Sequence, residues 1–195
     1  MHEIVQETIC NHKQQLSPST GSLVFELVQR LRAEMHYIPN RTSVCTTAQE
    51  AWVQKYGVCQ DYAHLALTFC RLADIPARYV SGFIAYPKAT AMHAWIEAFV
   101  SWESMSNTAN APELGFWVAL DPTHGCYADE RYITVAIGRD YSNVKPVSGS
   151  FLGVAKASVT SRCEIQELRE DKFGSPIFGK DVCPASQLFH PVSHP

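Results

Sequence analysis

Three side chains that can act together on a carbonyl group occur in order along this chain. Cys59 stands where an apolar helical pattern begins, His93 lies in a segment of alternating polarity, and Asp121 ends a short apolar run. A histidine can take the proton of a cysteine thiol, and an acid can fix the tautomer of that histidine. The residue types and their order therefore predict acyl transfer through a thioester on Cys59, with all three as catalytic residues.

The segment around Cys59 favours a reactive thiol. Gly57 interrupts the preceding helical pattern, so Cys59 falls in the first turn of the next helix. Free backbone N–H groups at a helix start stabilise a thiolate and can hold the oxyanion of a tetrahedral intermediate. The nearby carboxylate of Asp61 opposes the thiolate, so we expect the thiol to need His93 as its partner. We expect the strand that carries His93 to hold the imidazole more firmly than a loop would.

The pattern of apolar residues predicts helices followed by strands. Helical spacing occurs over about 22–36, 47–55 and 59–72, and the second of these segments opens on a capping box of Thr47 and Glu50. Alternating or apolar runs predict strands over 78–84, 93–100, 116–120, 133–137 and 153–165. Helices first and an antiparallel sheet second is the order of the α+β class.

We expect one domain with a segment on either side. A polar lead-in covers residues 1–21, a catalytic domain covers 22–170, and an extended or disordered tail covers 171–195. The segment 101–115 is polar and rich in Ser, Asn and Ala, which predicts a surface loop between two strands.

Composition narrows the classes of function. The chain has 195 residues, 46% of them apolar, with a net charge of −3 and scattered basic residues, which disfavours nucleic acid and anionic membranes as partners. No apolar run approaches the roughly 18 residues of a membrane span, and the first residues lack a secretory signal pattern, so we expect a cytoplasmic protein. The seven cysteines include no Cys-x-x-Cys pair, and we expect reduced thiols, no cofactor and no metal.

Several blocks in order resemble the bacterial transglutaminase-like superfamily. They are Gly57-Val58-Cys59-Gln60-Asp61-Tyr62-Ala63, Ile75-Pro76-Ala77-Arg78-Tyr79-Val80-Ser81-Gly82, His93-Ala94-Trp95 and Asp121-Pro122-Thr123, with similar segments at 128–131 and 138–141. The resemblance covers about residues 22–165. It implies a papain-like α+β core in which N-terminal helices, with the catalytic cysteine at a helix start, pack on an antiparallel sheet. It also implies a Cys–His–Asp triad at Cys59, His93 and Asp121.

The triad leaves the acyl acceptor open. Water gives a hydrolase or protease, whereas an amine gives an amide synthase or transamidase. The expected substrate is a peptide, an amide or an acyl group on a carrier protein. The last is included because proteins that resemble this one include amide synthases and cyclases, which take acyl chains from carrier-protein thioesters in natural-product assembly. The non-enzymatic alternative is a protein that binds peptides in the same cleft without catalysis.

Two further hypotheses concern histidines. A zinc site could combine Cys59, His93, His124 and Cys126, although their spacing fits no metal signature. His64 lies five residues after Cys59 on the same predicted helix, on a different side, and is expected to be structural.

Overall fold

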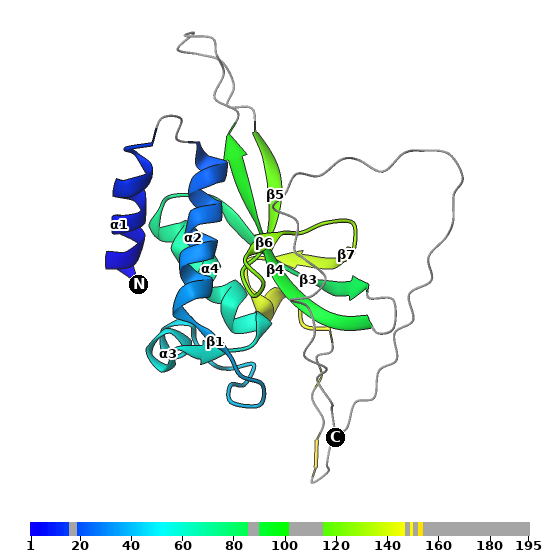
Figure 1. Cartoon of the computed structure of the whole chain (residues 1–195). Helices are drawn as coiled ribbons and strands as arrows, with labels where there is room; N and C mark the ends of the chain where they lie inside the picture. The colour runs from blue at the N-terminus through cyan, green and yellow to red at the C-terminus, as the bar shows by residue number, and fades with distance from the viewer. Residues whose placement is uncertain (16–18, 86–89, 102–114, 147–148, 150–151, 154–195) are drawn as a thin grey trace, which may run out of the picture.

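The computed structural model describes residues 1–15, 19–85, 90–101, 115–146, 149 and 152–153 (Figure 1). Helices occupy the first part of the chain, and they are α1 His2–His12, α2 Thr20–Glu34, α3 Ala48–Gln54 and α4 Cys59–Leu72. The longer strands follow, and they are β3 Ala77–Ala85, β4 Thr90–Ser101, β5 Gly115–Asp121 and β7 Tyr132–Gly138. The short elements are the strands β1 His36–Tyr37, β2 Tyr56–Gly57 and β6 Cys126–Tyr127 and the 3-10 helix η1 Tyr141–Asn143.

Five strands form one antiparallel sheet in the order β6-β5-β4-β3-β7. The helices gather on one side of this sheet: α4 contacts β4, α2 lies against α4, and α1 lies outside α2 (Figure 1). A small parallel pair of β1 and β2 connects the end of α2 to the start of α4. This arrangement confirms the predicted α+β class.

The apolar side chains of α4 make it the centre of the core. Tyr62, Leu65 and Phe69 of this helix are fully buried, as are Ile96 of β4 and Leu120 of β5. Each such side chain stabilises the fold by about 1.5–3 kcal/mol relative to an exposed one. The helix that begins at Cys59 is therefore held firmly against the sheet.

The local patterns located most elements well. The strands predicted over 78–84, 93–100, 116–120 and 133–137 lie within β3, β4, β5 and β7. The capping box is also present, since the backbone N–H of Glu50 donates to Thr47 Oγ1 at 3.2 Å and the N–H of Thr47 donates to Glu50 Oε2 at 2.8 Å. The predicted loop 101–115 apart from its ends, the strand 153–165 apart from Gly153, and the tail 171–195 lie outside the described residues.

Helix α1 was not predicted, and its contacts explain why. It lies in the polar segment assigned as a lead-in, and of its apolar side chains only Val5 is fully buried. Contacts to α2 hold it: His12 Nδ1 lies 3.1 Å from Glu26 Oε2, and Arg30 donates to Glu7 at 3.0 Å. Polar contacts between separate helices leave no apolar periodicity in the sequence. Within the described part of the chain, none of the helices has the length and apolar character needed to cross a bilayer.

Candidate active site

Cys59 is the first residue of α4, with its side chain half-buried. The turn before it is fixed by Asp61, whose Oδ2 accepts from the backbone N–H of Val58 at 2.8 Å and from Thr42 Oγ1 at 2.7 Å. Gly57 is needed here because a Cβ at its position would lie 2.6 Å from the Cβ of Asp61. The sequence thus places the thiol at a rigid helix start, where the first backbone N–H groups have no acceptor within the helix.

His93 and Asp121 are brought together by the pairing of β4 with β5. In this register Ile96 lies opposite Leu120, so Asp121, at the end of β5, is a diagonal neighbour of His93 on the same face of the sheet. His93 Nε2 lies 2.7 Å from Asp121 Oδ2, and the two side chains are 8% and 0% exposed. A buried carboxylate therefore holds one nitrogen of the imidazole.

The other partner of the imidazole is the thiol. Burial alone would lower the pKa of His93, but the charge and hydrogen bond of Asp121, together with a hydrogen bond and charge from Cys59, raise it to about 10. The imidazolium is consequently the favoured form of His93 at neutral pH. An imidazolium between a carboxylate and a thiol stabilises the thiolate.

Asp121 holds more than the one histidine. Its Oδ2 also accepts from His124 Nδ1 at 2.5 Å and from the hydroxyl of Tyr132 at 2.7 Å, and its Oδ1 accepts from the backbone N–H groups of Thr123 and His124 at 2.8 and 3.3 Å. Burial opposes ionisation, but the charge of His93 and the hydrogen bonds of both histidines hold the pKa of Asp121 well below its ordinary value. Asp121 is therefore a carboxylate at neutral pH.

Tyr37 lies at the edge of this group. It pairs with Gly57 in the small parallel sheet, and it is half-buried. Burial raises the pKa of its hydroxyl to about 12, and the charges of Cys59 and Asp121 act in the same direction. The hydroxyl of Tyr37 thus stays protonated at neutral pH.

The sequence predicted no catalytic role for Tyr132 and His124, which both contact Asp121. Tyr132 was not considered, because it reaches Asp121 from β7, on the far edge of the sheet. His124 was considered only as a zinc ligand. Its position three residues after an aspartate in a turn was the one local signal available, since such a spacing lets the side chains meet.

The geometry bears on the zinc hypothesis. The possible ligand atoms of His93, Asp121 and His124 lie within 4.8 Å of one another, and among the described residues this is the one such group. However, both imidazole nitrogens lie only 2.5–2.7 Å from the same carboxylate oxygen. Ligand atoms about 2.1 Å from a tetrahedral zinc ion would be about 3.4 Å apart. We therefore interpret the group as a hydrogen-bonded cluster. Cys126 is outside it.

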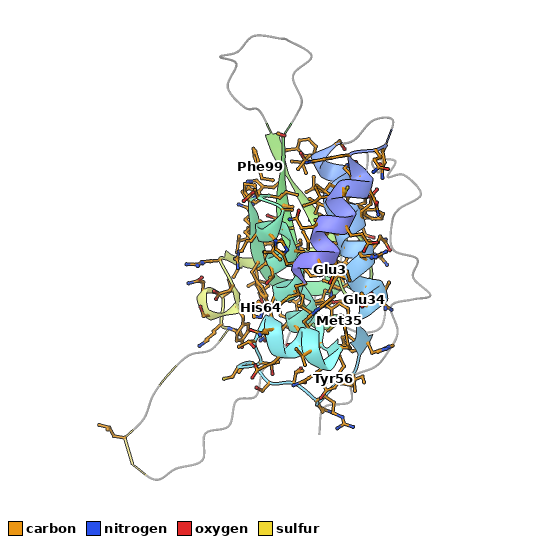
Figure 2. The ribbon with its side chains drawn as sticks, turned by 90° about the vertical axis from the view of Figure 1, so that its left-hand side faces the viewer. Glu3, Glu34, Met35, Tyr56, His64 and Phe99 are labelled. Carbon is orange, nitrogen blue, oxygen red and sulfur yellow. The ribbon has the colours of Figure 1, made fainter. Side chains whose placement is uncertain are left out.

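His64 lies elsewhere on α4, on the side toward η1 (Figure 2). Its Nε2 accepts from the backbone N–H of Tyr141 at 3.2 Å. Burial lowers the pKa of His64, which keeps this nitrogen free to accept. These contacts agree with a structural role.

A helix-borne cysteine facing a sheet-borne histidine and aspartate places the fold and site in the class of transglutaminase-like proteins. A model of the transglutaminase-like superfamily matches residues 7–122 of this chain. The chain belongs to that superfamily, as the resemblance predicted. The match begins within α1, before the domain start predicted at residue 22.

The curated relatives are longer than this chain. An uncharacterised protein of Mycobacterium leprae is 36% identical over an alignment of 146 residues, and the match covers 70% of this chain and 47% of that protein. An uncharacterised protein of Mycobacterium tuberculosis is 36% identical over 126 residues, which are 64% of this chain and 40% of that protein. The chain thus spans less than half the length of the curated relatives that it matches.

A solved structure shares the fold. It is a "Putative Cysteine Protease" from Cytophaga hutchinsonii, with a TM-score of 0.56 and 24% identity over 73% of this chain and 44% of that one. At this level of identity the likeness concerns the fold.

Proposed function

We propose that this chain is a cysteine-dependent acyl-transfer enzyme that works through an S-acyl intermediate on Cys59. Membership of the transglutaminase-like superfamily supports a cysteine-dependent enzyme in general terms. The observation that carries the proposal is the position of His93, which is hydrogen-bonded to the carboxylate of Asp121 and interacts with the thiol of Cys59. Each neighbour favours the imidazolium–thiolate pair from which a thiol attacks.

The first half-reaction forms the acyl-enzyme. The Cys59 thiolate attacks the carbonyl carbon of an amide or thioester, and a sulfur–carbon bond forms. The backbone N–H of Cys59, free at the helix start, donates to the oxyanion. His93 then gives its proton to the leaving amine or thiol as the bond to that group breaks. The neutral imidazole keeps its hydrogen bond to Asp121 and is ready to act as a base.

The second half-reaction releases the acyl group. Neutral His93 takes a proton from water or from an amine, which attacks the thioester carbonyl, and the sulfur–carbon bond breaks. The thiolate and the imidazolium are restored together. Water yields an acid and an amine yields a new amide. We propose a peptide, amide or carrier-protein-bound acyl group as donor.

Intact-protein mass spectrometry tests this function. The wild-type chain is incubated with a glutamine-containing peptide or with a short acyl thioester, and Cys59→Ser and Cys45→Ala serve as variant and matched control. We expect an added acyl mass in the wild type and in Cys45→Ala, because Cys45 is an exposed cysteine on another segment, and none in Cys59→Ser. The donor that yields an adduct, the peptide or the thioester, identifies the substrate class. An equal adduct in Cys59→Ser would refute the proposal.

Thiol reactivity separates the enzyme from a binding protein. We expect iodoacetamide to modify Cys59 faster than the exposed thiols of Cys10 and Cys45, because a thiolate paired with an imidazolium is the nucleophilic form. Cys70 should stay unmodified in the folded chain, since burial raises the pKa of its thiol to about 12. Peptide mapping of the labelled protein gives the four rates. If iodoacetamide modifies Cys59 no faster than Cys45, the result would indicate a non-catalytic protein.

A further inference from the structure

The Oδ2 atom of Asp121 is the meeting point of three side chains from three segments. His93 comes from β4, His124 from the turn after β5, and Tyr132 from the start of β7, and their donor atoms lie 2.7, 2.5 and 2.7 Å away. A carboxylate oxygen offers about two lone-pair sites. Three donors therefore share about two acceptor sites on this oxygen. Each hydrogen bond to the oxygen weakens the other two.

We infer that Tyr132 and His124 are positioning residues that set how strongly Asp121 holds the imidazole of His93. This inference rests on the proposed function, because it concerns the proton that His93 gives and takes during acyl transfer. Tyr132 and His124 touch the carboxylate and act through it on His93. They divide its negative charge, so that the imidazolium can release its proton to a leaving group.

Tyr132 is held in place by aromatic contacts as well as by its hydroxyl. Its ring meets Trp95 edge-on, with centroids 5.3 Å apart, and lies 6.1 Å from the ring of His93. Trp95 fits there because residue 82 is glycine: a Cβ at that position would lie 2.6 Å from the indole and 2.1 Å from the carbonyl oxygen of Ile133. The ring of Tyr132 therefore keeps its place when the hydroxyl is removed, and Tyr132→Phe changes mainly the hydrogen bond.

Asp121 also keeps its place in that variant. Its Oδ1 accepts from two backbone N–H groups, which no side-chain substitution at position 132 removes. Loss of the Tyr132 hydroxyl should therefore leave the carboxylate where it is and return negative charge to its bond with His93. Loss of a hydrogen bond to a charged group typically moves a pKa by roughly one to two units. We expect part of this change as a rise in the pKa of His93.

The other titratable groups around the cluster come from separate elements. Cys59 on α4 interacts with His93, Tyr37 on β1 interacts with the charges of Cys59 and Asp121, and Cys126 Sγ lies 3.9 Å from the hydroxyl of Tyr132. Of these groups only Cys126 loses a contact in Tyr132→Phe, and that contact is weak, because a cysteine sulfur is a weak hydrogen-bond partner and the distance is 3.9 Å. A change in the titration of His93 in this variant therefore reports the lost hydrogen bond.

The test is an NMR titration of the histidine side chains in the 195-residue chain, labelled with nitrogen-15 on histidine. We expect the midpoint of His93 to move upward by about one pH unit in Tyr132→Phe. Tyr141→Phe, a half-buried tyrosine on η1, is the control and should leave the midpoint unchanged. A midpoint in Tyr132→Phe that stays in place or falls, with the wild-type circular dichroism spectrum retained, would overturn the inference.

His124 gives a second test with its own internal control. Asn carries an amide N–H close to the position of Nδ1, whereas Ala has no donor. We expect His124→Ala to raise the midpoint of His93 as Tyr132→Phe does, and His124→Asn to restore it toward the wild-type value. Equal midpoints in His124→Ala and wild type would count against the shared carboxylate. The titration needs no substrate, so it is independent of the acyl-enzyme experiment, whose failure would refute the proposed function alone.

Discussion

His93 Nε2 lies 2.7 Å from Asp121 Oδ2, although 28 residues separate the two in the sequence. The pairing of β4 with β5 produces this contact, and the surrounding core excludes water from it. A buried ion pair of this kind fixes both the orientation and the protonation of the imidazole. The ion pair of His93 and Asp121 and the helix start at Cys59 each predict measurable effects.

Asp121→Asn should slow acyl-enzyme formation by at least about 100-fold while leaving some slow acylation, because an amide favours the wrong imidazole tautomer and cannot balance the imidazolium charge. Stopped-flow measurement of acylation would show this. Asp140→Asn is the matched control, since Asp140 caps η1 and lies outside the site, and it should retain the wild-type rate. Equal rates in the two variants would exclude Asp121 from the reaction.

The stability of the fold should depend on pH through His93. Its pKa is raised in the folded chain from 6.5 to about 10, so the folded state binds the proton more tightly than the unfolded state does. The resulting stabilisation is complete below the unfolded pKa and is lost as the pH rises through the folded one. Urea unfolding of the wild type and of His93→Gln at about pH 6, 8 and 10 measures it. The difference between the two proteins should shrink as the pH rises; a constant difference would contradict the assignment.

Gly57→Ala should destabilise the chain by about 1–3 kcal/mol, the usual cost of overpacking. The added methyl would lie 2.6 Å from the Cβ of Asp61 and would push on the turn that leads into Cys59. Gly149→Ala is the matched control, because a Cβ at Gly149 meets nothing within 4 Å among the residues that the structure describes. Chemical denaturation gives both free energies of unfolding. If the two substitutions lower the free energy of unfolding equally, the close approach at Gly57 does not affect stability.

Thr42→Val should cost about 1–3 kcal/mol, because it removes a donor from a buried carboxylate while keeping the side-chain shape. Thr42 Oγ1 donates to Asp61 Oδ2 at 2.7 Å, and Asp61 is 1% exposed. Its Oδ1 has no hydrogen-bond partner among the described residues, so the remaining bonds matter more. Thermal unfolding measures the loss, and Thr42→Ser, which keeps the hydroxyl, should recover most of it. A Thr42→Ser variant as unstable as Thr42→Val would point to packing instead.

Local patterns determined a large part of this protein. Alternating or apolar runs located β3, β4, β5 and β7 to within three residues at each end, because these signals lie within the strands themselves. The apolar helix beginning at Cys59 and the glycine before it placed the thiol at a helix start, since both signals act within a few residues. The resemblance in the segments around Cys59, His93 and Asp121 then directed attention to these three side chains, and the superfamily it indicated is confirmed.

The tertiary structure decided which side chains meet. Nothing in the order of the residues sets Ile96 opposite Leu120, yet this register brings Asp121 to His93. Tyr132 reaches the same carboxylate only because β7 pairs with β3 on the edge of the sheet, with a shift in register beside Gly82. Strand order and register are fixed by packing between distant segments, which side-chain periodicity along one strand does not encode. The sequence by itself therefore indicated a thiol, a histidine and an acid, and the folded sheet decided that Asp121 also holds His124 and Tyr132.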